Sequence, residues 1–534
     1  MSKLARRSKS KNKATNGQTI SIEKSFEDGA VADCSAKENL EKCRSSKKVF
    51  STARSEVLGR YLVANRDICA GEMVIDGEQP LVVGPVQQSD LLCLGCYVPL
   101  SFEHFRCKKC NWPLCAPSCS GLYVQSGHDE AECDLLTSIL FDEELQRDKM
   151  NVYNCIVPLR CLLLKKKSKS KWKLLEKMES HDQVRRKISD VWELNENTVV
   201  KKLQKYFDPQ EIHTICGILE VNCFEVSRTE ISLRALFPEA TLMSHNCVAN
   251  TIHTNDDELR LRVRASVSIP KGEPITISYA YTLQGTACRR AHIKKTKFFD
   301  CICQRCSDST ELRTNLSTLM CPKCNHPTLF SAQPLHQNAA WICTRKKCAK
   351  YTVSRVYVDS SIEKFENKLK FIPENCIESY EDWIKEASVI FHQNHYLITG
   401  VKYTLSLLYG KTDGFLLQDL SHDLLQRKIK ICEELLDIAN IIQPGLSRLR
   451  GILLYELHAP IMMLLNHKRK TRHPSKKQLK HSLQRILTCL RESSDILQFE
   501  SENTMEGKIG RAAKEALESA YLWEEELGSF ARME

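Results

Sequence analysis

The chain has 534 residues, of which 42% are hydrophobic and 27% are charged, and its formal net charge is +11. A chain of this length does not fold around one core, so we expect three or more folded units. The composition is typical of a soluble globular protein, and no apolar segment is long enough to cross a bilayer. The basic N-terminus lacks a following apolar stretch, so we expect no signal peptide.

The chain contains 26 cysteines, and their spacing indicates metal binding. Fifteen of them fall into groups of seven, four and four, and 11 are scattered. Without a signal peptide, zinc explains these groups better than disulfide bonds do. We therefore expect an intracellular protein in which the scattered cysteines are free thiols.

Residues 1–50 are rich in Ser, Lys, Asn and Glu and contain almost no large apolar residues. Such a segment does not bury enough surface to offset the entropy of ordering, so we expect a disordered basic tail. Its basic run, residues 6–13, is most simply a solvated segment. Nuclear import and nucleic-acid contact are the alternatives.

Residues 51–92 carry the first predicted strands. Strands over 59–64 and 73–75 are joined by a turn that contains glycine, and residues 80–84 form a third strand. Taken alone, the turn at Gly59 would be an ordinary hairpin.

Residues 93–133 contain seven cysteines and one histidine at zinc-ligand spacing. The eight residues are Cys93, Cys96, Cys107, Cys110, Cys115, Cys119, His128 and Cys133. They make two tetrahedral sets, the geometry that structural zinc prefers. A segment of this size with so few core aliphatic residues needs metal to fold. Trp112 and Tyr97 are expected to be packing residues; a peptide groove is the alternative.

Residues 134–235 are predicted to be helical. Apolar residues recur there at helical spacing, as at Leu135, Leu136, Ile188 and Val191. The basic run Lys165–Lys173 is expected to be a loop or an exposed helix face, with nucleic-acid contact as the alternative.

Residues 236–309 hold the most informative pattern. A polar turn within 242–251 carries His245 and Cys247, and an alternating strand over 259–269 follows it. A second short strand ends at Tyr279. Three closely spaced thiols, Cys301, Cys303 and Cys306, then need a fourth ligand to complete a zinc site.

The C-terminal part begins with a second cysteine-rich module. Cys321, Cys324, Cys343 and Cys348 form a four-thiol set that predicts a zinc ribbon. Beyond residue 360 helical periodicity dominates, most clearly in an apolar face that recurs every three or four residues from 425 to 439. The basic run Lys468–His473 is expected to be a loop between helices.

The His-Asn-Cys turn, the strands after it and the terminal Tyr279 resemble the second half of a SET domain. Together with the metal-ligand spacings they resemble the SET and MYND domain (SMYD) family of protein-lysine methyltransferases, over roughly residues 50–530. Gly59-Arg60-Tyr61 is similar to the SmydA-like branch.

The resemblance implies an α+β multidomain fold in which a MYND zinc finger and a helical insert split a β-rich SET domain. The implied units are a tail (1–50), the first SET part (51–92), the finger (93–133), the helical insert (134–235), the catalytic SET part (236–284), a post-SET zinc segment (285–309), a zinc ribbon (310–352) and a helical tetratricopeptide-like domain (360–534). No clean 34-residue repeat is visible, so the tetratricopeptide assignment rests on the family alone.

The resemblance also implies the zinc ligand sets. In the finger, one ion is held by Cys93, Cys96, Cys115 and Cys119, and the other by Cys107, Cys110, His128 and Cys133. Cys247 supplies the fourth ligand of the post-SET ion. Three zinc ions are therefore expected, with a fourth in the ribbon.

The implied cofactor is S-adenosylmethionine, and Tyr279 corresponds to the catalytic tyrosine. The residues expected to contact the cofactor are Gly59, Arg60, Asn222, Ser244, His245 and Phe299. Three departures stand against activity. Ser244 replaces an asparagine, Ala249 replaces a proline, and Lys297 lies where active relatives carry a second tyrosine.

Two functions follow from this resemblance. The first is a lysine methyltransferase that acts on histone or other proteins in transcriptional regulation, in nucleus and cytoplasm. The second is a zinc-rich adaptor with a weak or silent site. The finger is expected to bind Pro-rich peptides and the protein to be a monomer. We expect neither membrane insertion nor direct nucleic-acid binding.

Overall fold

The computed structural model describes residues 48–87, 89–101, 103–124, 127–140, 153–228, 231–348, 351–472 and 475–533. The tail predicted for residues 1–50 lies almost entirely outside this range. The first element is the hairpin of β1 (Phe50–Ser55) and β2 (Gly59–Ala64), in which Phe50 pairs with Ala64. Gly59 has a φ of +65°, which explains glycine at this turn, since a residue with a Cβ would be strained there.

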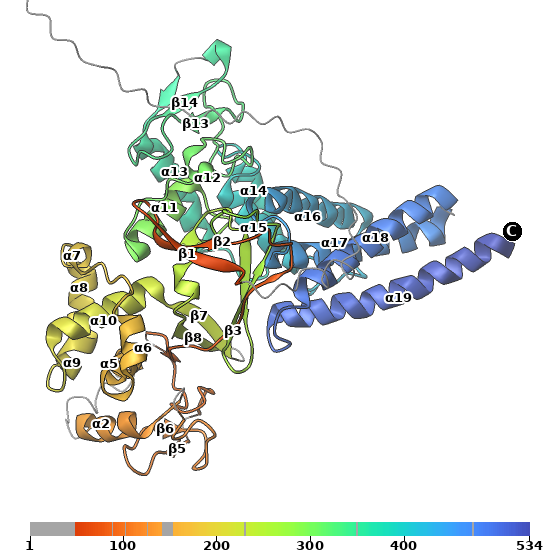
Figure 1. The fold of residues 1–534 in the computed structure, drawn as a ribbon. Coiled ribbons are helices and arrows are strands. Elements are labelled where there is room, and N and C mark those ends of the chain that lie inside the picture. Colours follow the sequence, from red (N-terminus) through yellow and green to blue (C-terminus); the bar gives the residue numbers. More distant parts are fainter. Residues whose placement is uncertain are drawn as a thin grey trace, which may run out of the picture. The chain divides into compact units, whose positions relative to one another are not determined.

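Strands on the two sides of the insertion pair with each other (Figure 1). From the first side, β3 (Met73–Glu78) pairs with β11 (Leu261–Ala265), and β4 (Val82–Pro85) pairs with β8 (Ile231–Leu236). The sheets are completed by β10 (Thr251–Asn255) beside β11 and β7 (Phe224–Arg228) beside β8. The two separated parts therefore form one set of sheets, as the resemblance implies.

The strand that leads to Tyr279 is short. β12 (Thr276–Ile277) runs parallel to β9 (Ser244–His245), with Thr276 opposite Ser244 and Ile277 opposite His245. This pairing brings the His-Asn-Cys turn and the residues that follow Ile277 together.

The inserted segment begins with the finger, whose only regular strands among the described residues are β5 (Phe105–Arg106) and β6 (Pro113–Leu114). The helices that follow are α2 (Glu130–Leu140), α5 (Ile156–Lys167), α6 (Lys169–Leu175), α7 (Asp182–Arg185), α8 (Ser189–Asn195), α9 (Lys201–Leu203) and α10 (Pro209–Asn222). Asp208 caps α10 by accepting a hydrogen bond from Glu211 N, and Pro209 opens the helix. The predicted insert is helical up to Asn222, but its last residues form β7 and β8 and are not helical, contrary to the prediction for 134–235. The basic run lies on α5 and α6, where Lys165 and Lys167 form ion pairs with Glu211 and Asp129.

After β12 come α11 (Thr286–Lys297) and α12 (Gln304–Ser307), then a three-stranded sheet of β13 (Leu329–Ser331), β14 (Trp341–Cys343) and β15 (Thr352–Val353). This sheet is the predicted ribbon.

The remaining chain is helical, and the α+β class is confirmed. Its helices are α13 (Arg355–Leu369), α14 (Ile377–Ala387), α15 (Tyr396–Leu408), α16 (His422–Ile442), α17 (Arg448–Arg472), α18 (Lys476–Leu497) and α19 (Met505–Met533). From α14 to α19 each helix packs against the next along the chain (Figure 1). In addition, α17 contacts α15 and α19. In α16 the predicted apolar face is buried at Leu425, Cys432, Leu436 and Ala439.

One local prediction is wrong. Lys468–Arg472 are not a loop but the last residues of α17, and His473 lies outside the described residues. None of the helices in the described part of the chain is long and apolar enough to cross a membrane.

The turn between α16 and α17 contacts Ser266, the residue that follows β11. Leu446 N donates a hydrogen bond to Ser266 O at 2.9 Å. Gly445 has a φ of +73°, and a Cβ on it would lie 1.9 Å from Ser266 O. Only glycine fits this contact without displacement of the backbone.

Candidate cofactor site and zinc centres

Four groups of cysteine and histidine side chains, most of them buried, occur in the described residues. Within each group the potential ligand atoms lie within 4.8 Å of one another. The groups are Cys93, Cys96, Cys115 and Cys119; Cys107, Cys110, His128 and Cys133; Cys247, Cys301, Cys303 and Cys306; and Cys321, Cys324, Cys343 and Cys348. The structure thus gathers the 16 residues expected from the sequence, in the same four sets.

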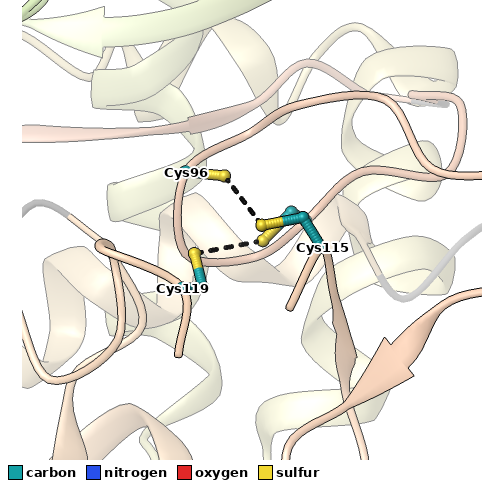
Figure 2. Close-up of side chains that lie close together, drawn as sticks. Cys96, Cys115 and Cys119 are labelled. Atoms are coloured by element: carbon teal, nitrogen blue, oxygen red, sulfur yellow. Dashed lines mark hydrogen bonds between the residues drawn. The ribbon is translucent and has the colours of Figure 1, made fainter. Parts of the chain in front are cut away.

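The sulfur separations fit a metal and not disulfides. In the first finger group, Cys93 Sγ lies 3.6 Å from Cys119 Sγ, and Cys96 Sγ lies 3.5 Å from Cys115 Sγ. Figure 2 shows the sulfurs of Cys96, Cys115 and Cys119 turned toward one another. A tetrahedron with zinc–sulfur bonds of about 2.3 Å has sulfur–sulfur edges of about 3.8 Å. A disulfide would need a separation of about 2.05 Å. The four groups therefore suit zinc.

The second finger group is supported by a buried carboxylate and a buried guanidinium. His128 Nε2 lies 3.1 Å from Cys110 Sγ, and its Nδ1 lies 2.9 Å from Glu132 Oε1. Arg160 on α5 donates to Glu132 Oε1 at 3.0 Å and to Val83 O of β4 at 2.8 Å. Burial alone would raise the pKa of Glu132, but the charge of Arg160 holds it below its usual range. One network therefore joins the finger, the insert and a SET strand.

Tyr97 and Trp112 are packing residues, as expected. Their exposed fractions are 2% and 4%. Trp112 packs edge-on against Tyr153, and Tyr97 Oη accepts a hydrogen bond from Arg160 Nη1. Neither side chain is available to line a peptide groove in this conformation.

The post-SET group has a buried cationic partner that the sequence analysis missed. Arg289 on α11 donates to Cys247 Sγ at 3.3 Å, to Cys306 Sγ at 3.5 Å and to Glu311 Oε2 at 2.6 Å. Arg305 also contacts Glu311. Burial alone would raise the pKa of Glu311, but the charges of the two arginines hold it below its usual range. Four thiolates around one zinc ion carry a net negative charge, and Arg289 offsets it at a site that water does not reach.

Tyr279 lies where the short strands meet. Its hydroxyl donates to Met243 O at 2.5 Å, and its backbone N–H donates to His245 Nδ1 at 3.0 Å. Burial raises the pKa of Tyr279 to about 12, so the hydroxyl carries its proton at neutral pH. The phenol can therefore orient a polar group but cannot serve as a base.

Lys297, the last residue of α11, lies beside this tyrosine. Its Nζ is 5.5 Å from the centre of the Tyr279 ring and donates to Val221 O at 2.6 Å and to Glu220 O at 3.4 Å. These carbonyls end α10, where the helix dipole favours a cation. Burial lowers the pKa of Lys297. The cation suspected from the sequence therefore stands next to Tyr279.

Among the other expected cofactor residues, His245 and Phe299 cluster with Tyr279, whereas Arg60 and Asn222 bind backbone carbonyls of the insert. His245 has its ring centre 5.2 Å from that of Tyr279 and 6.0 Å from that of Phe299, whose exposed fraction is 38%. Asn222, at the end of α10, donates from Nδ2 to Glu179 O at 2.9 Å and to Ile218 O at 2.8 Å. Arg60 donates to Lys177 O, and Ser244 lies on β9 beside His245. The structure thus groups His245, Tyr279, Phe299 and Lys297 by direct contacts.

Tyr281, two residues after Tyr279, is another tyrosine that could take the place of the one Lys297 replaces. Its exposed fraction is 71%, and its ring lies 5.9 Å from that of His292. It therefore does not replace the missing second tyrosine.

The sequence carried one signal for a missed residue. Arg160 interrupts an apolar run, Ile156–Leu164, that is buried throughout. A charge in such a run requires a buried partner of opposite charge, but nothing in the sequence identified Glu132 as that partner.

Comparison with known proteins agrees with this geometry. Residues 59–280 match the SET domain family. The chain is 32% identical over 284 residues to Drosophila melanogaster SET domain-containing protein SmydA-8, isoform A. This match covers 51% of this chain and 59% of the relative. It is 25% identical to Arabidopsis thaliana histone-lysine N-methyltransferase ASHR1, over 47% of this chain and 53% of the relative.

Danio rerio N-lysine methyltransferase SMYD2-B is 24% identical, over 47% of this chain and 58% of the relative. The chain spans less than two thirds of the length of each of these relatives. The SET domain match, the zinc-ligand groups and these relatives agree with the resemblance to the SET and MYND domain family and its SmydA-like branch.

Proposed function

We propose that this protein is an S-adenosylmethionine-dependent protein-lysine N-methyltransferase. The observation that carries the proposal is Tyr279. Its protonated, partly buried hydroxyl lies at the meeting point of β9 and β12, within the segment that matches the SET domain. Relatives named as N-lysine methyltransferases support the reaction class.

The reaction sets the tasks of the site. Methyl transfer forms a bond between the lysine nitrogen and the methyl carbon, breaks the bond from that carbon to the sulfonium sulfur, and releases a proton from the amine. The cofactor supplies the activated methyl group. The protein must align the two reactants and keep the amine free of water, because only the neutral amine attacks.

Named residues are suited to these tasks. Tyr279 would orient the amine through its hydroxyl oxygen. The half-exposed ring of Phe299 offers a face on which an adenine can stack. Asn222, Ser244, His245, Gly59 and Arg60 are the remaining proposed cofactor contacts.

The four ligand groups would hold four structural zinc ions. Each set offers four protein ligands, which leaves no open position for chemistry on the metal. The proposed role of zinc is therefore to fix the finger, the post-SET segment and the ribbon.

A second candidate is an adaptor with a weak or silent site, and Lys297 favours it. A cation 5.5 Å from the Tyr279 ring opposes the approach of a lysine ammonium. We rank this candidate second because Tyr279 keeps its hydrogen bonds to Met243 O and His245 Nδ1. The first proposal also includes histone or other protein substrates, a role in transcriptional regulation, and residence in nucleus and cytoplasm. It further includes Pro-rich ligands of the finger and a monomeric state.

Transfer of label from methyl-labelled S-adenosylmethionine tests the proposal. Zinc-loaded protein is incubated with histones and with whole-cell lysate, and label in lysine is measured. The proposal predicts incorporation that Tyr279→Phe removes. Cofactor binding without incorporation would support the adaptor instead.

A further inference from the structure

His245 lies between the post-SET zinc group and Tyr279. Its Nε2 is 3.3 Å from Cys247 Sγ, and its Nδ1 accepts the Tyr279 N–H at 3.0 Å. His245 belongs to β9, which pairs with β12, and Tyr279 follows β12 by two residues. The imidazole therefore bridges a metal ligand and the backbone of the proposed catalytic residue.

The hydrogen bonds fix which ring nitrogen carries the proton. A backbone N–H only donates, so His245 Nδ1 must be the unprotonated acceptor. A neutral imidazole then carries its proton on Nε2, which points at the Cys247 sulfur. Both ring nitrogens are occupied, so the imidazole has no free donor for a cofactor, and a cofactor contact at this residue would come from its backbone.

The Cys247 sulfur is held from a second side. Arg289 Nε donates to it at 3.3 Å, and Arg289 also contacts Gln284 O at 2.5 Å and Glu311. The arginine thus joins the zinc group to the loop that follows Tyr279. A thiolate, which zinc binding maintains, accepts hydrogen bonds from Arg289 and His245 more strongly than a thiol does.

We propose that His245 is a positioning residue that transmits the order of the Cys247 zinc centre to Tyr279. With zinc bound, the Cys247 thiolate holds the Nε2–H form of His245, and Nδ1 then fixes the Tyr279 backbone. When the centre loses its ion, the ring loses its orienting acceptor and Tyr279 loses a backbone hydrogen bond. The inference rests on the proposed function only for the consequence for methyl transfer.

Two measurements test this without a turnover assay. The first is the ring nitrogen-15 spectrum of histidine-labelled, zinc-loaded protein, with the His245 signal assigned by its loss in His245→Gln. The proton must be on Nε2. A proton on Nδ1 would overturn the inference.

The second measurement is amide exchange of Tyr279 with and without the post-SET ion. Cys303→Ser weakens this centre, and metal analysis verifies the loss of one ion. Tyr279 exchange should then rise about tenfold, as expected for the loss of one backbone hydrogen bond. Unchanged exchange would contradict the relay, that is, the coupling of the Cys247 zinc centre to Tyr279 through His245.

Two variants of His245 separate the role of Nδ1 from the role of Nε2. His245→Asn keeps an acceptor near the Nδ1 position and loses the donor to Cys247, so Tyr279 exchange should stop responding to Cys303→Ser. His245→Gln keeps a donor near the Nε2 position, so exchange should already be fast. His292→Gln, which alters a histidine on α11 outside the relay, should behave like the wild-type protein. If the wild-type protein transferred no methyl group, the proposed function would fail while these readouts would still decide the inference.

Discussion

At the residue scale, the site is defined by Tyr279 and by the charge beside it. The Tyr279 hydroxyl is protonated at neutral pH and bonded to Met243 O, so it can orient an amine but not deprotonate it. Lys297 is the residue in the site that opposes the proposed reaction most directly. Its ammonium contacts the end of α10 and the face of the tyrosine ring.

Replacing Lys297 should therefore improve the acceptor affinity. In Lys297→Met the like charge is removed, and we expect the KM for a labelled acceptor protein to fall about three- to tenfold. Lys297→Arg keeps the charge and is the matched control. Steady-state kinetics of both variants checks this, and an equal KM in Lys297→Met and wild-type protein would rule out the charge effect.

At the element scale, the partly buried carboxylate of Glu78 and the buried carboxylate of Glu132 join different elements. Glu78 at the end of β3 accepts from Glu239 N at 2.7 Å and from Ala240 N at 3.1 Å, at the short 3-10 helix Ala240–Leu242. Glu132 on α2 similarly joins His128 to Arg160. Each carboxylate closes a contact across the insertion or within it.

Glu78 predicts a pH dependence of stability. Burial raises the pKa of Glu78 to about 7 from 4.5. A raised folded pKa means that the folded state binds the proton more tightly. Its contribution to stability is therefore full below the unfolded pKa and is lost as the pH rises through 7. Glu78→Gln does not titrate, so it does not lose this contribution. As the pH rises from below the unfolded pKa to above 7, the free energy of unfolding of the variant should increase relative to that of the wild-type protein by about 1–3 kcal/mol.

Thermal unfolding midpoints of the two proteins across this pH range give the comparison. Parallel curves for the variant and the wild-type protein would show that Glu78 does not titrate differently on folding.

Glu132 predicts faster zinc loss from one finger site. Glu132→Gln keeps the shape of the side chain and removes the charge that orients His128 and pairs with Arg160. We expect about 10–100-fold weaker zinc binding at this site. Zinc release to a chromogenic chelator measures it, with the exposed Glu130→Gln on the same helix as control. Equal release from the two variants would remove Glu132 from the support of the site.

At the scale of the whole molecule, zinc is expected to determine which parts stay folded. The finger, residues 93–133, has only two short strands among its described residues, so its fold depends on its ligand groups. Chelation should abolish amide protection there while the helices α14–α19 keep theirs. Protection of the finger that survives complete zinc removal would refute the metal assignment.

Local patterns made the cysteine clusters, the short strand before Tyr279 and the helical C-terminal part predictable, because ligand spacing and periodicity are properties of short segments. The division of the finger ligands into two sets and the assignment of Cys247 to the post-SET group came from the family resemblance. The buried pairs were not predictable, because Arg160 and Glu132 are 28 residues apart and Arg289 and Glu311 are 22 apart. The basic run at Lys468–Arg472 was misread because lysine and arginine favour helices as readily as exposed loops. The charge beside Tyr279 was inferred from the family position, while its contact with α10 required the structure.

The central claim is that the Tyr279 site transfers methyl groups. The most direct measurement is the yield of S-adenosylhomocysteine in zinc-loaded wild-type protein and in Tyr279→Phe, each with lysate proteins as acceptors and with the affinity for S-adenosylmethionine measured in parallel. We predict product matched by new methyl-lysine in the wild-type protein, a loss of about 100-fold or more in the variant, and equal cofactor affinity in both. Equal yields in the two proteins, or tight cofactor binding with no product in either, would contradict the account.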